Sequence, residues 1–187
     1  MKILREVGIT VLIAVVVFVL LQLNVQSYTV VMSSMEPNIH EGECIMVNKA
    51  TYRSSGPQRG EVIIFDPPFP SEYPYIKRII GLPGDTVEIK DGKVFVNDIP
   101  LVEADIIPSP NYTMPAKKIP ETEYFVLGDN RNSSNDSHGG WMVPRDNIIG
   151  KAWFTYWPPS SCGVVKHYGY PELLVTEGQE IVSYQSP

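Results

Sequence analysis

The sequence predicts a mainly β protein, in which a single N-terminal transmembrane helix precedes a compact antiparallel β domain of short strands and hairpins. The 187 residues include 17 prolines and 14 glycines, which favour turns and short strands. Val7 to Leu23 is an uncharged apolar run, and Thr86 to Val96 has the pattern of a hairpin. We therefore expect a membrane anchor over residues 1–25 and one extracytoplasmic β domain over residues 26–187.

The apolar run is the predicted anchor. Its length of about 17 residues lies at the short end of what crosses a bilayer, and the uncharged stretch up to Tyr28 can extend it. A cleavable signal peptide is the alternative, but residues 21–27 offer no small-x-small cleavage site. Lys2 and Arg5 precede the run, and no further Lys or Arg occurs until Lys49. The amino end is thus expected in the cytoplasm, in a single-pass protein of the cell membrane.

Short strands are predicted wherever β-branched and aromatic residues gather between turn residues. Asp91 and Gly92 fit the type I′ turn of a two-residue hairpin. Residues 103–123 change in composition and are expected to form a Pro-rich surface excursion. The predicted strands are Tyr28–Met32, Cys44–Val47, Glu61–Phe65, Tyr75–Ile80, Thr86–Lys90, Lys93–Val96, Tyr124–Leu127 and Ile148–Trp157, with one more after residue 163 before the end frays.

Two local features leave expectations to test. Phe69 lies in a Pro-rich stretch that cannot be a central strand, and its ring either packs under a loop or contacts lipid headgroups. Lys77 and Arg78 are neighbours in a predicted strand, so their side chains face opposite sides and one of them should point inward.

The charge of the chain and the spacing of its cysteine, histidine and aspartate residues limit which partners and cofactors are expected. A net charge of -6 without any basic block argues against nucleic acid. Cys44 and Cys162 lie far apart and can either pair or remain two separate buried thiols. No cluster of His, Cys and Asp has ligand spacing, so neither a metal nor an organic cofactor is expected.

Three stretches carry candidate chemistry: Ser34–Pro37, Tyr75–Asp85 and Gly128–Ser137. In this order behind one anchor, and together with residues 59–62 and 150–152, they resemble the bacterial type I signal peptidases, the membrane-anchored Ser/Lys proteases of the leader peptidase family. The resemblance extends from the anchor to about Trp157. It implies a serine endopeptidase that removes signal peptides from exported preproteins after small-x-small sequences such as Ala-x-Ala. The implied partners are those signal peptides and the lipid bilayer, with the export translocon as a further candidate.

The chemistry requires a serine and a base. An ammonium in water has a pKa of about 10.4, and burial among apolar side chains such as Ile76 and Ile79 lowers it. By match to the family motifs, Ser34 would be the nucleophile and Lys77 the general base, which later protonates the leaving amine. The backbone N–H of Ser34 would contribute to the oxyanion hole, and Ser134 would orient the lysine amine.

The resemblance also implies supporting and substrate-binding residues. Asp129, Arg131 and Asp136 match the charged positions that brace the third stretch against the lysine strand. The positions that match or flank the pockets for small side chains are Val30, Met35, Ile39, Tyr75 and Ile76.

Two positions depart from the family pattern. Met32 stands two residues before the nucleophile, where a hydroxyl in some members completes the oxyanion hole; Ser33 is the alternative donor, although it should point the other way on an extended strand. His138 stands where arginine is more usual.

Three other readings remain open. A self-cleaving repressor has a similar catalytic part but needs a DNA-binding module at the amino end. A membrane-anchored β domain that binds peptides without cleaving them is motivated by Met32. A histidine-based serine hydrolase would use His40, His138 or His167, none of which lies in a recognisable triad setting.

Overall fold

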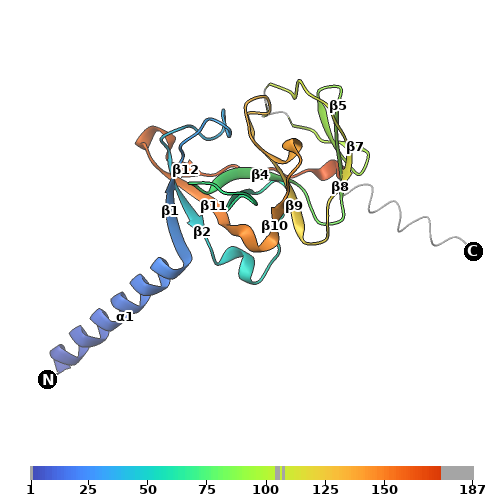
Figure 1. Ribbon diagram of the computed structural model, residues 1–187. Helices are drawn as coiled ribbons and strands as arrows, with labels where there is room; N and C mark the ends of the chain where they lie inside the picture. Colours follow the sequence, from blue (N-terminus) through green and yellow to red (C-terminus); the bar gives the residue numbers. More distant parts are fainter. Residues whose placement is uncertain (1, 104–105, 107, 174–187) are drawn as a thin grey trace, which may run out of the picture.

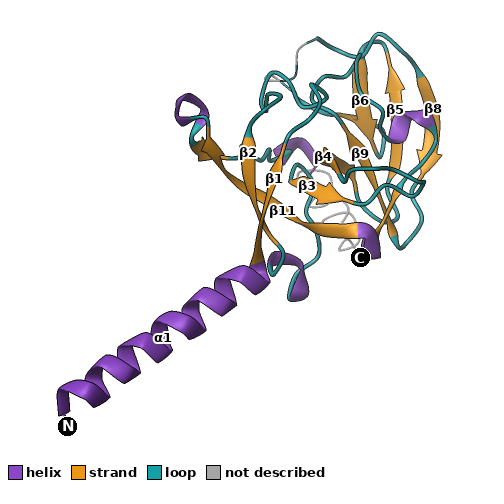
Figure 2. Ribbon diagram, turned by 60° about the vertical axis from the view of Figure 1, so that its left-hand side comes forward, coloured by secondary structure: helices purple, strands orange, loops and turns teal. Residues whose placement is uncertain are grey.

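The computed structural model describes residues 2–103, 106 and 108–173. It confirms the mainly β architecture: one long helix, α1 (Lys2–Asn24), continues directly into the first strand of a body made of two antiparallel sheets (Figure 1). Figure 2 shows α1 leading away from this body, to one side of the strands.

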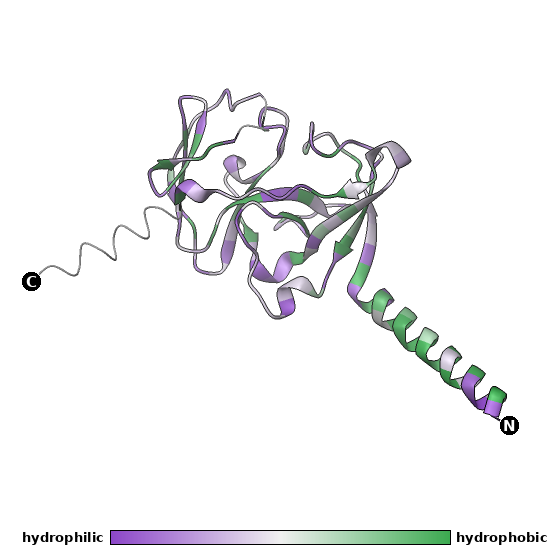
Figure 3. Cartoon of the chain, turned by 180° about the vertical axis from the view of Figure 1, so that it is seen from behind, coloured by the Kyte–Doolittle hydropathy of each residue, from purple (hydrophilic) through white to green (hydrophobic). Residues whose placement is uncertain are grey.

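Helix α1 is a candidate membrane span. Its segment Arg5–Asn24 has a mean hydropathy of 2.5, and none of it is buried against the rest of the protein. Figure 3 shows hydrophobic residues along most of the helix and hydrophilic ones near its amino end. Twenty residues rise about 30 Å, which matches the hydrocarbon thickness of a bilayer. Length and composition therefore permit a span, although a signal sequence has the same properties.

The larger sheet carries the candidate chemistry and is curled into a half-barrel. Register shifts where β11 pairs with β2 and β3 mark β-bulges, which bend a strand and increase its twist. The strands follow the order β1 (Val25–Thr29), β2 (Cys44–Asn48), β11 (Ile148–Trp157), β3 (Val62–Phe65), β4 (Tyr75–Gly81), β9 (Glu123–Leu127) and β10 (Val143–Pro144), and β12 (Gly163–Val164) pairs with β11.

The smaller sheet has the order β7 (Ile99–Pro100), β6 (Lys93–Val96), β5 (Thr86–Lys90) and β8 (Met114–Lys118). Positive φ angles of 51° at Asp91 and 70° at Gly92 confirm the predicted hairpin turn. A hydrophobic cluster joins this sheet to β4 and β9 through Ile80 and Phe125. Short 3-10 helices lie at Thr51–Arg53, Ser137–Gly139, Arg145–Asn147 and Pro159–Ser161.

Two strand predictions need correction. The extended segment expected at Tyr28–Met32 lies earlier: β1 ends at Thr29, opposite Cys44, and the chain then leaves the sheet. The serine therefore lies in a turn region rather than at a strand end. The excursion at residues 103–123 is only partly irregular, because Met114–Lys118 pairs with β5 as β8. The expected last strand is β12, and the rest of the predicted tail lies largely outside the described residues.

The surroundings of Lys77, Arg78, Phe69 and the two cysteines agree only in part with the predictions. Lys77 and Arg78 face opposite sides, yet both are buried, because the chain near Lys166 and Tyr168 covers the second face of β4. Phe69 packs in an aromatic cluster, with its ring centroid 5.9 Å from that of Tyr75 and 5.5 Å from that of Trp141. Both cysteines are free thiols, but neither is buried: Cys44 is half-buried and Cys162 is exposed.

Candidate active site

Ser34 lies in a compact turn that is anchored in the core. The N–H of Glu36 donates to the carbonyl of Ser33 over 3.1 Å, and the N–H of Ile39 donates to the carbonyl of Met35 over 3.0 Å. The side chains of Met35 and Ile39 are buried in a hydrophobic cluster with residues of β2 and β3. The two buried side chains and the turn hydrogen bonds thus fix the backbone that follows the serine.

Lys77 reaches Ser34 from the middle of β4. Its Nζ lies 2.6 Å from the Oγ of Ser34 and also donates to the carbonyl of Ile76 over 2.9 Å. Lys77 is 4% exposed and Ser34 is 8% exposed, so this contact is largely shielded from water. The structure therefore brings together the two residues that the sequence singled out as nucleophile and base.

Burial lowers the pKa of Lys77 from 10.5 to about 8, because the charged ammonium loses its hydration inside the protein. The negative charges of Asp136 and Asp129 oppose this effect. Neither carboxylate forms an ion pair with Lys77, and no other ion pair is recorded for this amine among the described residues. The amine can therefore lose its proton near neutral pH.

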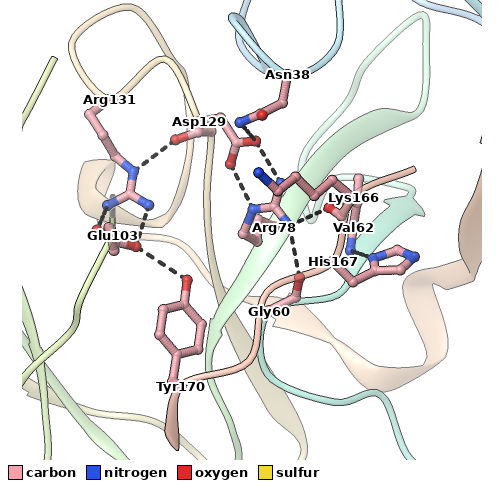
Figure 4. A network of polar contacts seen from close by, with 11 residues as sticks. Asn38, Gly60, Val62, Arg78, Glu103, Asp129, Arg131, Lys166, His167 and Tyr170 are labelled. Carbon is pink, nitrogen blue, oxygen red and sulfur yellow. Dashed lines mark hydrogen bonds and ion pairs between the residues drawn. The ribbon is translucent and has the colours of Figure 1, made fainter. Parts of the chain in front are cut away.

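The opposite face of β4 is held by a buried ion pair (Figure 4). Arg78 donates to both carboxylate oxygens of Asp129, over 2.8 and 2.7 Å, and both side chains are fully buried. Asp129 also accepts a hydrogen bond from Asn38, which follows the serine turn. The next residue, Asn130, donates its backbone N–H to the carbonyl of Ser34 over 3.0 Å and its side-chain amide to that of Ser33 over 3.2 Å. These contacts link the lysine strand to the serine turn.

Gly128 allows the third stretch to approach the serine. A Cβ at this position would lie 2.4 Å from the carbonyl oxygen of Ser34 and 2.3 Å from the Oγ of Ser134. The Ser134 hydroxyl is buried without a hydrogen-bond partner in the described part of the chain, and thus makes no hydrogen bond to Lys77. Ser134 is near the site, but the predicted orienting contact is not formed here.

The other predicted supports contact different partners. Arg131 pairs with Glu103 over 2.6 Å and donates to the carbonyl of Gly128, and Tyr170 donates to the same Glu103 carboxylate (Figure 4). Asp136 accepts from the backbone N–H of Gly128 and lies 2.6 Å from Nδ1 of His138. Arg131 and Asp136 therefore shape the third stretch, whereas Asp129 is the member that contacts the lysine strand.

Two clefts meet at Ser34 and Lys77. The first has a volume of about 460 Å³ and is largely apolar; it includes the predicted pocket residues Val30, Tyr75 and Ile76. The predicted pocket residues Met35 and Ile39 lie instead in the core. Residues that the prediction missed are Ser27, Tyr28, Thr29, Val31, Met32, Ile64 and the segment 71–74. The adjacent apolar residues just before the serine, Val31 and Met32, were a sequence signal for part of this lining, and both are exposed.

The second cleft has a volume of about 280 Å³. Besides Ser34 and Lys77 it is lined by Val31, Met32, Ser33, Glu41, Tyr75, Ser133 and Asn135. The serine and lysine thus lie at the junction of an apolar cleft and a more polar one, where an extended peptide could pass from one to the other.

The histidines have other surroundings. Nδ1 of His167 accepts from the N–H of Val62, and burial lowers the pKa of His167 to about 4. His138 stacks on Tyr112 and contacts Asp136, whose hydrogen bond raises the pKa of His138. His40 is exposed, with Nδ1 3.9 Å from a carboxylate oxygen of Glu36. No hydrogen bond between a histidine and Ser34 is recorded in the ranges that the structure covers.

Comparison with known proteins assigns the family. The family model "Signal peptidase, peptidase S26" matches residues 3–157. A probable signal peptidase I-1 of Synechocystis is 42% identical over 137 residues, which cover 70% of each chain. A probable signal peptidase I-2 of the same organism is 41% identical over 71% of this chain and 63% of its own length. Signal peptidase IB of Staphylococcus aureus is 34% identical over 84% of this chain and 90% of its own.

These similarities and the β domain define the class of protein as a serine endopeptidase. The chain belongs to the signal peptidase family, peptidase S26, and is an enzyme of the signal peptidase I type. The family predicted from the three sequence stretches is thereby confirmed.

Proposed function

We propose that this protein is a membrane-anchored endopeptidase that removes N-terminal signal peptides from exported preproteins after small-x-small sequences, with Ser34 as nucleophile and Lys77 as general base. The observation that carries the proposal is the 2.6 Å contact between the two side chains, both buried, at the junction of two clefts. The proposal also includes a single-pass membrane anchor over residues 1–25 and a catalytic domain over residues 26–187.

The reaction follows from this contact. The nitrogen lone pair of neutral Lys77 takes the proton of the Ser34 hydroxyl while Oγ bonds to the carbonyl carbon of the scissile peptide. The resulting ammonium gives that proton to the leaving nitrogen, and the C–N bond breaks. A water molecule, deprotonated by the same amine, then attacks the acyl carbon; the ester bond to Oγ of Ser34 breaks, and the ammonium returns the proton to Oγ.

The developing oxyanion needs hydrogen-bond donors. The backbone N–H of Ser34 is one, and no acceptor for it is recorded in the described segments. Such a donor is commonly worth about 3 kcal/mol of barrier. Met32 carries no hydroxyl, so the hydroxyl of the partly buried Ser33 is the second donor in this proposal. Ser134, whose hydroxyl has no recorded partner, would turn to the ammonium of Lys77 once the proton has moved.

The clefts support the substrate class. Val30, Ile64 and Ile76 give the first cleft an apolar surface that suits the end of a signal peptide. The peptide would bind in an extended conformation beside β4 and the segment before Ser34, adding backbone hydrogen bonds along them. Bulky side chains next to the cleaved bond would be rejected there.

The predicted anchor supports a catalytic site close to the membrane. Helix α1 ends at Asn24 and Ser34 follows ten residues later, which at about 3.3 Å per residue limits their separation to about 33 Å. Lys2 and Arg5 at the amino end favour a cytoplasmic amino terminus and an extracytoplasmic catalytic domain. The site would then work close to the outer membrane surface, on signal peptides that still lie in or beside the bilayer and the export translocon.

A preprotein cleavage assay tests the reaction and both residues. We expect the purified full chain to cut after a small-x-small sequence, and Ser34→Ala and Lys77→Ala each to abolish cleavage. Exposed positions supply matched controls, Ser54→Ala and Lys118→Ala, which should leave the rate unchanged. Binding without cleavage by the unmodified protein would favour the inactive peptide-binding domain. Retained activity in Lys77→Ala, combined with loss in a histidine variant, would favour the histidine-based hydrolase.

A further inference from the structure

The second cleft has two charged groups that differ in their exposure, and the proposed reaction uses only one of them. Its lining contains one carboxylate, Glu41, and one amine, Lys77. The amine of Lys77 is bound to Ser34 and to the carbonyl of Ile76, and Lys77 is only 4% exposed, whereas Glu41 is exposed to solvent. Ser133 and Asn135 add only neutral polar groups. Of the lining residues, Glu41 is therefore the exposed charged group that a peptide in this cleft would meet.

Glu41 is held beside the cleft by its backbone. It lies in a tight turn in which the N–H of Glu43 donates to the carbonyl of His40 over 3.2 Å. Gly42 adopts a φ of +83°, and its N–H donates to the carbonyl of Val30 over 2.8 Å. Val30 lines the first cleft, so the turn is tied to the segment that leads into Ser34. No ion pair of Glu41 is recorded among the residues that the structure describes.

The two clefts divide the substrate between them. The first cleft, with its apolar surface, suits the signal peptide, which leaves the second cleft for the residues that follow the cleaved bond. We propose that Glu41 is a specificity-determining residue of the second cleft, favouring basic and disfavouring acidic side chains in the first residues of the mature protein. This inference depends on the proposed function, because it assigns the product side of the same cleavage.

The expected effect is modest, because Glu41 is exposed to solvent. Exposed charge pairs change rates or affinities by about two- to fivefold at low salt, and screening reduces the effect. A Lys-bearing substrate should therefore gain, and an Asp-bearing substrate lose, about that factor relative to a neutral one. The ratio between the two substrates is the quantity to measure, because a general loss of folding or activity cancels in it.

The experiment uses the full chain in an uncharged detergent and three preproteins that differ only at the second residue after the cleaved bond, Lys, Gln or Asp. The unmodified enzyme should show kcat/KM in the order Lys, Gln, Asp. Glu41→Gln should flatten this order and Glu41→Lys should reverse it. Glu121→Gln removes an exposed carboxylate that lines neither cleft, and it should leave the order unchanged.

The outcomes separate the two proposals. If the unmodified enzyme cleaves all three substrates but Glu41→Lys keeps the original Lys/Asp ratio, the role of Glu41 is refuted and the proposed function stands. If no substrate is cleaved, or Ser34→Ala still cleaves them, the proposed function fails and the inference fails with it. A reversed ratio that shrinks as salt is raised would support the inference.

Discussion

The buried amine predicts a specific pH dependence of cleavage. With its pKa lowered to about 8, Lys77 is neutral in about one molecule in eleven at pH 7, whereas a lysine at 10.5 would be neutral in about one in three thousand. Burial thus enlarges the reactive population about 300-fold at neutral pH. We expect kcat/KM to rise about tenfold per pH unit below pH 7 and to level off above about pH 9.

The assay should use a preprotein without titrating groups near the cleaved bond and should return samples from each pH to pH 8 to verify that inactivation is reversible. A midpoint of the rise in kcat/KM near pH 6.5 would indicate histidine as the base. A midpoint above pH 10 would show that the lysine is hydrated when it reacts. A midpoint at either of these pH values, or a rate that does not change with pH, would refute the argument that burial activates Lys77.

Three further changes test the surroundings of the site. Lys77→Met removes a group whose pKa is lower in the folded protein than in the unfolded chain. Between pH 8 and pH 10.5 the unfolded chain binds more protons, so the unfolding free energy of the unmodified protein should rise by about 3 kcal/mol. Denaturant titration of the variant should not show this rise. Asp129→Asn leaves a buried guanidinium without its carboxylate and should destabilise the fold by about 3–5 kcal/mol, seen as a lower thermal midpoint than that of the unmodified chain. Gly128→Ala places a methyl group 2.4 Å from the carbonyl oxygen of Ser34 and should lower kcat at least tenfold. In the control variant Gly139→Ala the nearest neighbouring atom lies 4.0 Å from the added methyl group, and kcat should not fall. Equal rates for the two alanine variants would contradict the packing argument.

Local patterns explain the parts of the structure that the sequence predicted correctly. The turn at Asp91 and Gly92 needs positive φ at both residues, and these are residue types that tolerate it. Lys77 was identified by its match to the family motif, and its apolar neighbours in the strand explain why burial could lower its pKa. The turn is decided within a few residues of the chain, whereas the assignment of Lys77 also depended on three stretches in a fixed order behind one anchor.

The errors arose where distant segments decide the outcome. Arg78 is buried because the carbonyls of Gly60 and Lys166 accept from it and Tyr168 lies 4.0 Å from its guanidinium. Alternation along one strand cannot show that both faces of the sheet are covered. Likewise, β8 forms because β5 offers a partner, although the sequence of β8 has little strand character of its own.

The neighbouring cations of β4 show how one strand can keep one amine reactive and one guanidinium inert. Lys77 faces the serine and has no ion-pair partner among the described residues, so desolvation dominates and favours the neutral form. Arg78 faces a carboxylate that accepts two hydrogen bonds, and a guanidinium stays charged even when buried, so it serves as a fixed anchor. An arginine at position 77 could not act as a base, and a lysine at position 78 could not form the paired contacts that hold Asp129. The order of these two residues, together with the side of the sheet that each one faces, is therefore what the proposed chemistry requires of this strand.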